Sequence, residues 1–381
     1  MNGNLPDVPP STNWEAHWIW TGDAFFSELD RVIARARSTI RLETYFFEDG
    51  VQGARICHQL VEAALRGVEV RVLADGLNSP ADSSSFWSPL IAVQAKVSIF
   101  NPWTTKHPWI RNHRKLVVVD DDWAVVGGFN LADEFYGDGV TKGWLDCGLS
   151  LSGDGVRFLA DDFDSMWHRF AIGNGNSVVR GPWTRPVPLA LHAGFSLLRS
   201  GPGQVGRSLP SALKRDLADP RDVCIAVAYF LPGVGLRRAF VRAARAGRRI
   251  QFLLPGITDV PLSARAARYL YDRFLKAGIE IYEYQPQIMH AKLYVVGGAA
   301  YVGSSNLDVR SLRLNHELMV RLTDPGLVRE AEESFRGWLR HAKRINPDDW
   351  RSSRGLMEKL REKISFWILA RLDPFISRRL S

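Results

Sequence analysis

Two histidines, His113 and His290, lie in similar local sequences, one in each half of the chain. Residues 112–120 read Asn-His-Arg-Lys-Leu-Val-Val-Val-Asp, and residues 289–297 read Met-His-Ala-Lys-Leu-Tyr-Val-Val-Gly. Each histidine is followed two positions later by a lysine, Lys115 or Lys292. Because residues i and i+2 of a strand point to the same side, each His-x-Lys pair shares one face of its strand.

A short segment of the pattern Gly-(Gly/Ser)-x-Asn follows each histidine on the next predicted strand. It ends at Asn130, 17 residues after His113, and at Asn306, 16 residues after His290. Ser304 is the second residue of the later segment. Small residues let another group approach the backbone, and an asparagine amide is an uncharged hydrogen-bond donor.

These two histidines, two lysines and two asparagines would form a compact anion site if the fold brings them together. The lysines and amides can hold the non-bridging oxygens of a phosphoryl group. One neutral histidine can attack phosphorus while the other, protonated, gives a proton to the leaving oxygen. We therefore predict phosphoryl-group transfer on a phosphodiester, with no metal and no cofactor, since the lysines supply the positive charge.

Each histidine also needs a group that orients its ring, and a carboxylate on the next strand is the expected partner. The candidates are Asp146 in the first half and Glu317 in the second.

The elements around these motifs occur twice in the same order, with a period of roughly 180 residues. Short apolar strands alternate with amphipathic helices, which is typical of an α/β fold with sheets covered on both faces. The predicted elements of the first half are helix 24–37, strand 40–47, helix 54–66, strands 68–74, 96–100, 115–120, 123–127 and 145–151, and helix 156–170. Those of the second half are strand 223–230, helix 235–245, strand 250–254, helix 262–277, strands 279–284, 292–296, 300–303 and 317–322, and helix 327–343.

The segment 173–207 is rich in Gly, Pro and Ser and is predicted to connect the halves. We therefore expect a first half over 1–180, a second half over 181–345 and a basic amphipathic tail over 346–381. Three cysteines lack any paired spacing and are expected to be buried free thiols.

With its two His-x-Lys segments the sequence resembles the phospholipase D superfamily, whose members carry paired HxKxxxxD motifs. Residues 111–120 and 303–315, with 228–232 and 255–259, are similar to bacterial cardiolipin synthases, and the similarity extends over roughly residues 28–343. The resemblance implies two similar α/β halves, each a mixed sheet between helices, related by a pseudo-two-fold axis and sharing one active site.

The resemblance also implies a reaction. A phosphatidyl group would pass from phosphatidylglycerol to a histidine, and a second phosphatidylglycerol would then take it to give cardiolipin and glycerol. The family usually assigns the nucleophile to the first-half histidine, which corresponds to His113 and leaves His290 as the general acid. Since the two motifs are symmetric in sequence, the order stays open here.

The second motif departs from the family pattern. Asp120 completes the first motif and is counted with its catalytic residues, but the corresponding position of the second motif is Gly297. A deletion of one residue in the hairpin turn explains both this loss and the shorter spacing to Asn306. We expect the aspartate to have a structural role and activity to survive its loss; if it instead orients His290, this half is impaired.

The charge of the chain favours a lipid partner. Net charge is +8, and residues 351–381 carry eight Lys/Arg against three Asp/Glu. In segment 355–372, Leu356, Leu360, Ile364, Trp367 and Ile368 fall on one side of a helix, and basic residues lie elsewhere. Residues 374–379 add Pro, Phe and Ile and two arginines. Either this helix binds an anionic bilayer or it packs on the protein's own core.

No secretory signal and no membrane-spanning helix is predicted, so the expected location is peripheral, on the cytoplasmic face of a bacterial inner membrane. The expected partners are phosphatidylglycerol and other anionic phospholipids, and no nucleic acid, because the charge surplus is concentrated in the tail. The alternatives are a hydrolase of the same chemistry, either a phospholipase or a nuclease, and a non-catalytic lipid-binding protein.

Overall fold

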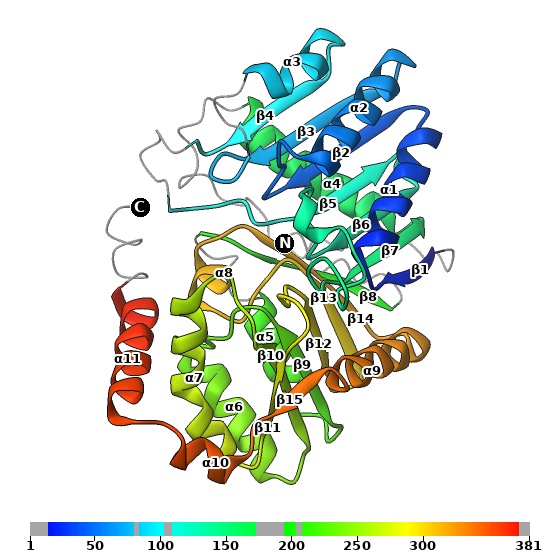
Figure 1. Cartoon of the computed structure of the whole chain (residues 1–381). Coiled ribbons are helices and arrows are strands. Elements are labelled where there is room, and N and C mark those ends of the chain that lie inside the picture. Colours follow the sequence, from blue (N-terminus) through cyan, green and yellow to red (C-terminus); the bar gives the residue numbers. More distant parts are fainter. Residues whose placement is uncertain (1–13, 80–83, 103–108, 173–193, 203–207, 373–381) are drawn as a thin grey trace, which may run out of the picture.

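The computed structural model describes residues 14–79, 84–102, 109–172, 194–202 and 208–372. Most of the expected connection 173–207, its boundary at residue 180 and the tail residues 374–379 lie outside this described part. The chain forms two α/β halves, each built on one mixed sheet (Figure 1). The fold class predicted from the sequence is confirmed.

The first half contains a seven-stranded sheet in the order β1-β7-β6-β5-β2-β3-β4. Strands β2, β3 and β4 are parallel to one another, and the remaining pairs are antiparallel. In chain order the strands are β1 (Trp14–Ile19), β2 (Thr39–Thr44), β3 (Glu69–Asp75), β4 (Lys96–Phe100), β5 (Leu116–Val119), β6 (Trp123–Gly127) and β7 (Gly148–Gly153). The helices are α1 (Gly22–Arg35), α2 (Val51–Leu65), α3 (Ser84–Ala92) and α4 (Val156–Trp167).

The second half repeats this arrangement with one additional edge strand, in the order β15-β11-β10-β9-β12-β13-β14-β8. Its strands are β8 (Phe195–Ser200), β9 (Val223–Val227), β10 (Ile250–Pro255), β11 (Glu280–Tyr284), β12 (Lys292–Val296), β13 (Ala299–Gly303), β14 (Glu317–Leu322) and β15 (Ala342–Arg344). Its helices are α5 (Ser208–Asp216), α6 (Val234–Arg245), α7 (Pro261–Leu275), α8 (Val309–Arg313) and α9 (Pro325–Leu339), followed by α10 (Pro347–Ser352) and α11 (Leu356–Trp367). The sequence repeat is thus a repeat of sheet topology.

The two halves share a hydrophobic core. One cluster of buried side chains joins the faces of both sheets with α4 and α9, while α1 to α3 and α5 to α7 cover the outer faces with separate clusters. Strands such as β5 and β9 are apolar and buried at every position, as expected for strands covered on both sides. Trp18 links the halves through its indole Nε1, which donates to the Leu327 carbonyl at 3.0 Å.

Several predicted elements end elsewhere in the structure. Strands β2 and β9 stop at Thr44 and Val227, three residues before the predicted ends, and β7 begins at Gly148 instead of residue 145. The helix predicted to run to residue 343 ends at Leu339, and the residues after it form the edge strand β15. The structure adds β1, β8, α3, α5, α8 and α10, which were not predicted.

Candidate active site

His113 and His290 lie side by side between the halves. Each precedes a central strand, β5 or β12, at the edge of the sheet where the parallel strands β2–β4 and β9–β11 end. Both side chains are buried, and the centroids of the two rings are 6.5 Å apart. The two histidines predicted from the repeat therefore form one cluster.

Backbone hydrogen bonds between the halves determine which groups meet there. The His113 N–H donates to the His316 carbonyl and the His316 N–H to the Arg111 carbonyl, both at 2.9 Å. On the other side of the cluster, the Leu145 N–H donates to the Ile288 carbonyl at 2.9 Å, and the His290 N–H donates to the Leu145 carbonyl at 2.7 Å. Each histidine segment is thus paired with the opposite half.

The carboxylates follow this crossed pairing. Glu317 of the second half lies 3.0 Å from Nδ1 of His113, and Asp146 of the first half lies 2.6 Å from Nδ1 of His290. Both predicted carboxylates contact a histidine, but the expectation of a partner on the next strand of the same half is wrong. The reason is that residues 145 and 316 are held by the opposite half, which directs the neighbouring carboxylates across the interface.

Small residues make room for these carboxylates. A Cβ atom on Gly128 would lie 2.1 Å from Oδ1 of Asp146, so this position must be glycine for the aspartate to remain in place. In the second half the corresponding residue is Ser304, whose hydroxyl donates to Glu317 and whose carbonyl lies 3.1 Å from Nδ1 of His113. Gly128 therefore accompanies Asp146 at one histidine, and Ser304 accompanies Glu317 at the other.

Both motif lysines are buried in the cluster. Nζ of Lys115 donates to the His113 carbonyl at 2.7 Å and lies 5.0 Å above the ring of Tyr45. Nζ of Lys292 lies 2.9 Å from each ring nitrogen of His290. Burial lowers the pKa of Lys115 to about 7 and that of Lys292 to about 8. A charged ammonium in this position therefore depends on nearby anions.

Burial also shifts the pKa values of the imidazole and carboxyl groups. It lowers the pKa of His113, against the attraction of Glu317. It lowers that of His290 further, and the ammonium groups of Lys292 and Lys115 act in the same direction. Burial raises the pKa of Asp146 to about 6, against the attraction of Lys292. Both rings are thus predominantly neutral at neutral pH before substrate arrives.

The two asparagines occupy equivalent places. Oδ1 of Asn130 accepts the Phe46 N–H at 3.2 Å, and Oδ1 of Asn306 accepts the Tyr229 N–H at 3.3 Å. These bonds fix each amide by its oxygen. Within the described residues neither Nδ2 atom has a protein partner, so each amide retains a donor for an anion.

Asp120 lies outside this cluster. It is in the turn after β5, where its carboxylate accepts the backbone N–H groups of Arg37, Ser38 and Thr39 at 2.7–2.9 Å. The geometry therefore does not support Asp120 as a catalytic residue. It supports the structural role that was expected for this aspartate. The equivalent Gly297 has a left-handed backbone with φ +58°.

Acidic residues that the motifs did not indicate hold the segment before His113. Asp75, at the end of β3, accepts the Asn112 N–H at 2.7 Å and contacts Arg111 at 3.1 Å. Glu43 accepts from the Asn112 amide at 2.8 Å and from Arg114 at 3.0 Å. In the sequence, both are acidic residues at or near the carboxyl end of a buried parallel strand. They could have been recognised from this position, because α/β sheets bind their ligands at that edge.

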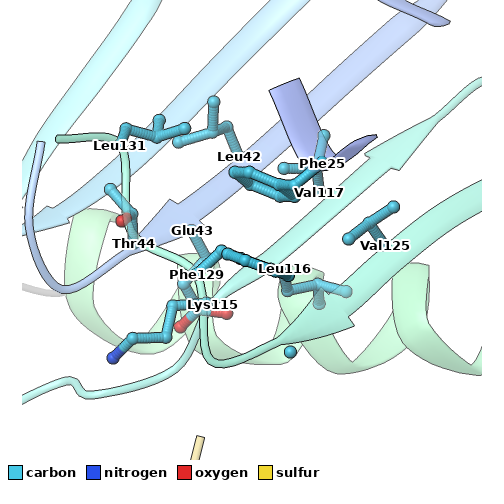
Figure 2. Close-up of a pocket in the computed structure, with 11 residues that line it drawn as sticks. Phe25, Leu42, Glu43, Thr44, Lys115, Leu116, Val117, Val125, Phe129 and Leu131 are labelled. Atoms are coloured by element: carbon cyan, nitrogen blue, oxygen red, sulfur yellow. The ribbon is translucent and has the colours of Figure 1, made fainter. Parts of the chain in front are cut away.

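A small, mostly apolar cavity lies behind Lys115, between α1 and the first sheet. Phe25, Leu42, Val117 and Val125 line it together with Lys115. In Figure 2 the lysine side chain extends away from these apolar groups, which leaves its ammonium on the side of the His113 carbonyl. The core of the first half thus directs this charge into the site.

The chain is similar in sequence to known proteins of one family. A family model described as "Cardiolipin synthase, PLD-like domain" matches residues 29–137 and 215–339, which is more than half of the chain. The probable cardiolipin synthase YwiE of Bacillus subtilis strain 168 is 27% identical over 90% of this chain and 69% of its own length. Cardiolipin synthase 1 of Bacillus cereus is 28% identical over 86% of this chain and 67% of its own length.

A solved structure has the same fold. The phosphatidylserine synthase of Haemophilus influenzae Rd KW20 superposes with a TM-score of 0.74, at 14% sequence identity, over 95% of this chain and 94% of its own.

Proposed function

This chain belongs to the phospholipase D-like family of cardiolipin synthases, and we propose that it transfers a phosphatidyl group from one phosphatidylglycerol to another. The products are cardiolipin and glycerol. The observation that carries the proposal is the pair of adjacent imidazoles, each held by a carboxylate of the opposite half and accompanied by a buried lysine.

In the first step His113 acts as the nucleophile. Its Nδ1 faces two acceptors, the Glu317 carboxylate and the Ser304 carbonyl, which keep the proton on Nδ1 and leave a lone pair on Nε2. Nε2 attacks phosphorus, and the bond from phosphorus to the glycerol headgroup breaks. His290, protonated once the anionic phosphodiester is bound, gives its proton to the departing glycerol oxygen.

In the second step the phosphatidyl group leaves His113. His290, now neutral, takes the proton from a hydroxyl of a second phosphatidylglycerol, and that oxygen attacks phosphorus. The bond from phosphorus to Nε2 breaks, which releases cardiolipin and restores both imidazoles. The lysines and the Asn130 and Asn306 amides hold the non-bridging oxygens in both steps. With water in place of the second lipid, the same steps give phosphatidic acid.

The substrate requires access to a lipid surface, and we propose that the protein works peripherally on the cytoplasmic face of a bacterial inner membrane, with anionic phospholipids as partners. Among the described residues no helix is long and apolar enough to cross a bilayer. We retain residues 1–180, 181–345 and 346–381 as the proposed boundaries of the two halves and the tail.

One assay tests the reaction. Purified protein is incubated with phosphatidylglycerol dispersed in detergent, and the lipids are identified by mass spectrometry. We expect cardiolipin and free glycerol in equal amounts, and no product from the His113→Ala variant. Phosphatidic acid alone would identify a hydrolase, and the absence of any product with a folded protein would favour a non-catalytic lipid-binding protein.

A further inference from the structure

Helix α11 carries its apolar side chains on the outside of the molecule. Five residues, which we call the apolar stripe, are 49–87% exposed: Leu356, Met357, Leu360, Ile364 and Trp367. They recur at helical spacing along one side of the helix. A surface of this kind on a soluble protein indicates an interaction site.

The opposite face of α11 is attached to the body of the protein. Arg354, just before the helix, pairs with Glu362 at 2.6 Å and with Asp272 of α7 at 2.9 Å. The ring of Phe366 packs on Tyr269 of α7 with centroids 4.6 Å apart. Since Arg354 and Glu362 are both buried, these contacts fix the rotation of the helix. The sequence left open whether the apolar side packs on the protein's own core, and among the described residues it does not.

Basic residues border the apolar stripe. At about 3.6 residues per turn, Lys359 and Lys363 lie along one side of it and Arg361 along the other. All three are exposed, and Glu358 is the exposed acidic residue of the helix, since Glu362 is buried against Arg354. An apolar strip between cations fits the boundary between headgroups and acyl chains in an anionic bilayer.

The end of α11 lies beside the active-site edge of the second sheet. Arg237, in the first turn of α6, lies 5.4 Å above the ring of Phe366. Helices α6 and α7 begin after the carboxyl ends of β9 and β10, the edge where the histidines lie. Three aliphatic residues are exposed there: Val234, Ile257 and Val260. In Figure 1 α11 runs along the outside of α7 toward the boundary between the halves.

We propose that the apolar stripe and these three aliphatic residues form one face that binds the surface of an anionic phospholipid bilayer. This inference rests on the proposed function, since it brings the site to its substrate. The bound occupant is a bilayer because the stripe is bordered by cations on both sides, which a purely apolar protein contact would not require. The contacts of Arg354 hold the stripe outward before the membrane is met.

The test compares two double variants of identical composition. Leu360→Glu with Ile364→Glu places two acidic groups in the apolar stripe. Leu65→Glu with Ile91→Glu makes the same exchanges at exposed positions near the ends of α2 and α3. These positions precede the starts of β3 and β4, at the edge of the first sheet opposite to the histidines. Co-sedimentation is measured with vesicles of phosphatidylglycerol and phosphatidylcholine, and with phosphatidylcholine alone.

We expect the stripe variant to bind anionic vesicles at least tenfold more weakly than the unaltered protein, and the control variant to bind within twofold of it. Binding of the unaltered protein should fall as salt is raised. Unchanged vesicle binding by the stripe variant would overturn the proposal. So would a stripe variant whose sole effect, in size-exclusion chromatography, is to dissociate an oligomer, because the stripe would then be a protein interface.

Activity assays with detergent-dispersed phosphatidylglycerol distinguish a failure of the proposed membrane face from a failure of the proposed reaction. If both hold, the stripe variant loses cardiolipin formation on vesicles and retains it in detergent, where no bilayer has to be bound. If the unaltered protein makes no cardiolipin in detergent but the stripe variant still loses vesicle binding, the reaction fails and the membrane face stands.

Discussion

At the scale of single residues, the crossed contacts of Glu317 and Asp146 make the site a property of both halves. Neither half contains a histidine together with the carboxylate that orients it. The carboxylate selects the tautomer and holds the ring, so its removal should affect the chemical step more than substrate binding.

We expect Glu317→Gln to lower kcat by about 10²–10⁴-fold with a much smaller change in KM, because the amide no longer favours the Nδ1–H tautomer of His113. Steady-state kinetics on detergent-dispersed lipid give both parameters. Glu333→Gln, at an exposed position of α9, serves as the control and should behave as the unaltered protein. A folded Glu317→Gln variant with the kcat of the unaltered protein would contradict the proposal that Glu317 orients His113 as the nucleophile.

The pKa shifts in the site predict a narrow pH range. Asp146, with a pKa of about 6, loses its charge as pH falls, and His290 then loses the anion that stabilises its imidazolium. Lys115 and Lys292, with pKa values of about 7 and about 8, lose their charges as pH rises. We expect kcat/KM to fall on both sides of this range, because this quantity follows the free enzyme. A profile that stays flat to pH 9 would exclude charged lysines as the phosphate-holding groups.

The histidines, lysines and asparagines of the site could be predicted from the sequence, because their spacing repeats in the two halves. His113, Lys115 and Asn130 follow the period of a strand and hairpin, and the repeat gives their counterparts His290, Lys292 and Asn306. Local spacing cannot encode the crossed contacts, since His113 and Glu317 are brought together by backbone pairing between distant segments. Asp75 was not assigned for the same reason.

At the scale of elements, the two hairpins differ in their turns. After β5, Asp120 accepts three backbone N–H groups from the start of β2 and so ties the turn to the neighbouring strand. After β12, Gly297 comes so close to the backbone that an added Cβ would lie 2.2 Å from the Asp216 carbonyl oxygen. In the second half, glycine is therefore required by the close approach of α5.

Restoring the family's aspartate should consequently harm this protein. We expect Gly297→Asp to destabilise it by about 1–3 kcal/mol through overpacking. Asp120→Asn should also cost about 1–3 kcal/mol, since charge-assisted bonds are weakened. Urea unfolding measures both.

The control is Asp122→Asn in the same turn, where the side chain is exposed and a change below about 0.5 kcal/mol is expected. Equal stability of Gly297→Asp and the unaltered chain would show that α5 moves aside. The folded Asp120→Asn protein should keep its activity, because residue 120 does not contact the histidines.

The order of elements followed from the sequence, but their ends near the site did not. Apolar residues continue past Thr44 and Val227, so a local reading extends both strands, whereas the chain turns there to bond Phe46 to Asn130 and Tyr229 to Asn306. The predicted strand at 145–151 likewise includes Leu145, which instead pairs with the opposite half. Strand propensity was overridden at the positions that build the site.

At the scale of the whole molecule, a buried ionic network stands behind the catalytic cluster and joins the halves. Arg114, next to His113, pairs with Glu43 and Asp162, and Asp162 also pairs with Arg199 of β8. Removing one partner of such a network leaves an uncompensated buried charge, so its effect would reach both the interface and His113. The position of the nucleophile and the association of the halves thus depend on the same residues.

Detection of the covalent intermediate is the direct test of His113 as the nucleophile. Protein is mixed rapidly with phosphatidylglycerol in detergent and unfolded at mildly alkaline pH, and its peptides are examined by mass spectrometry. We predict a phosphatidyl group on His113 that forms before cardiolipin and is absent from His113→Ala. Cardiolipin formation without an adduct on His113, or with the adduct on His290 instead, would contradict the proposed role of His113.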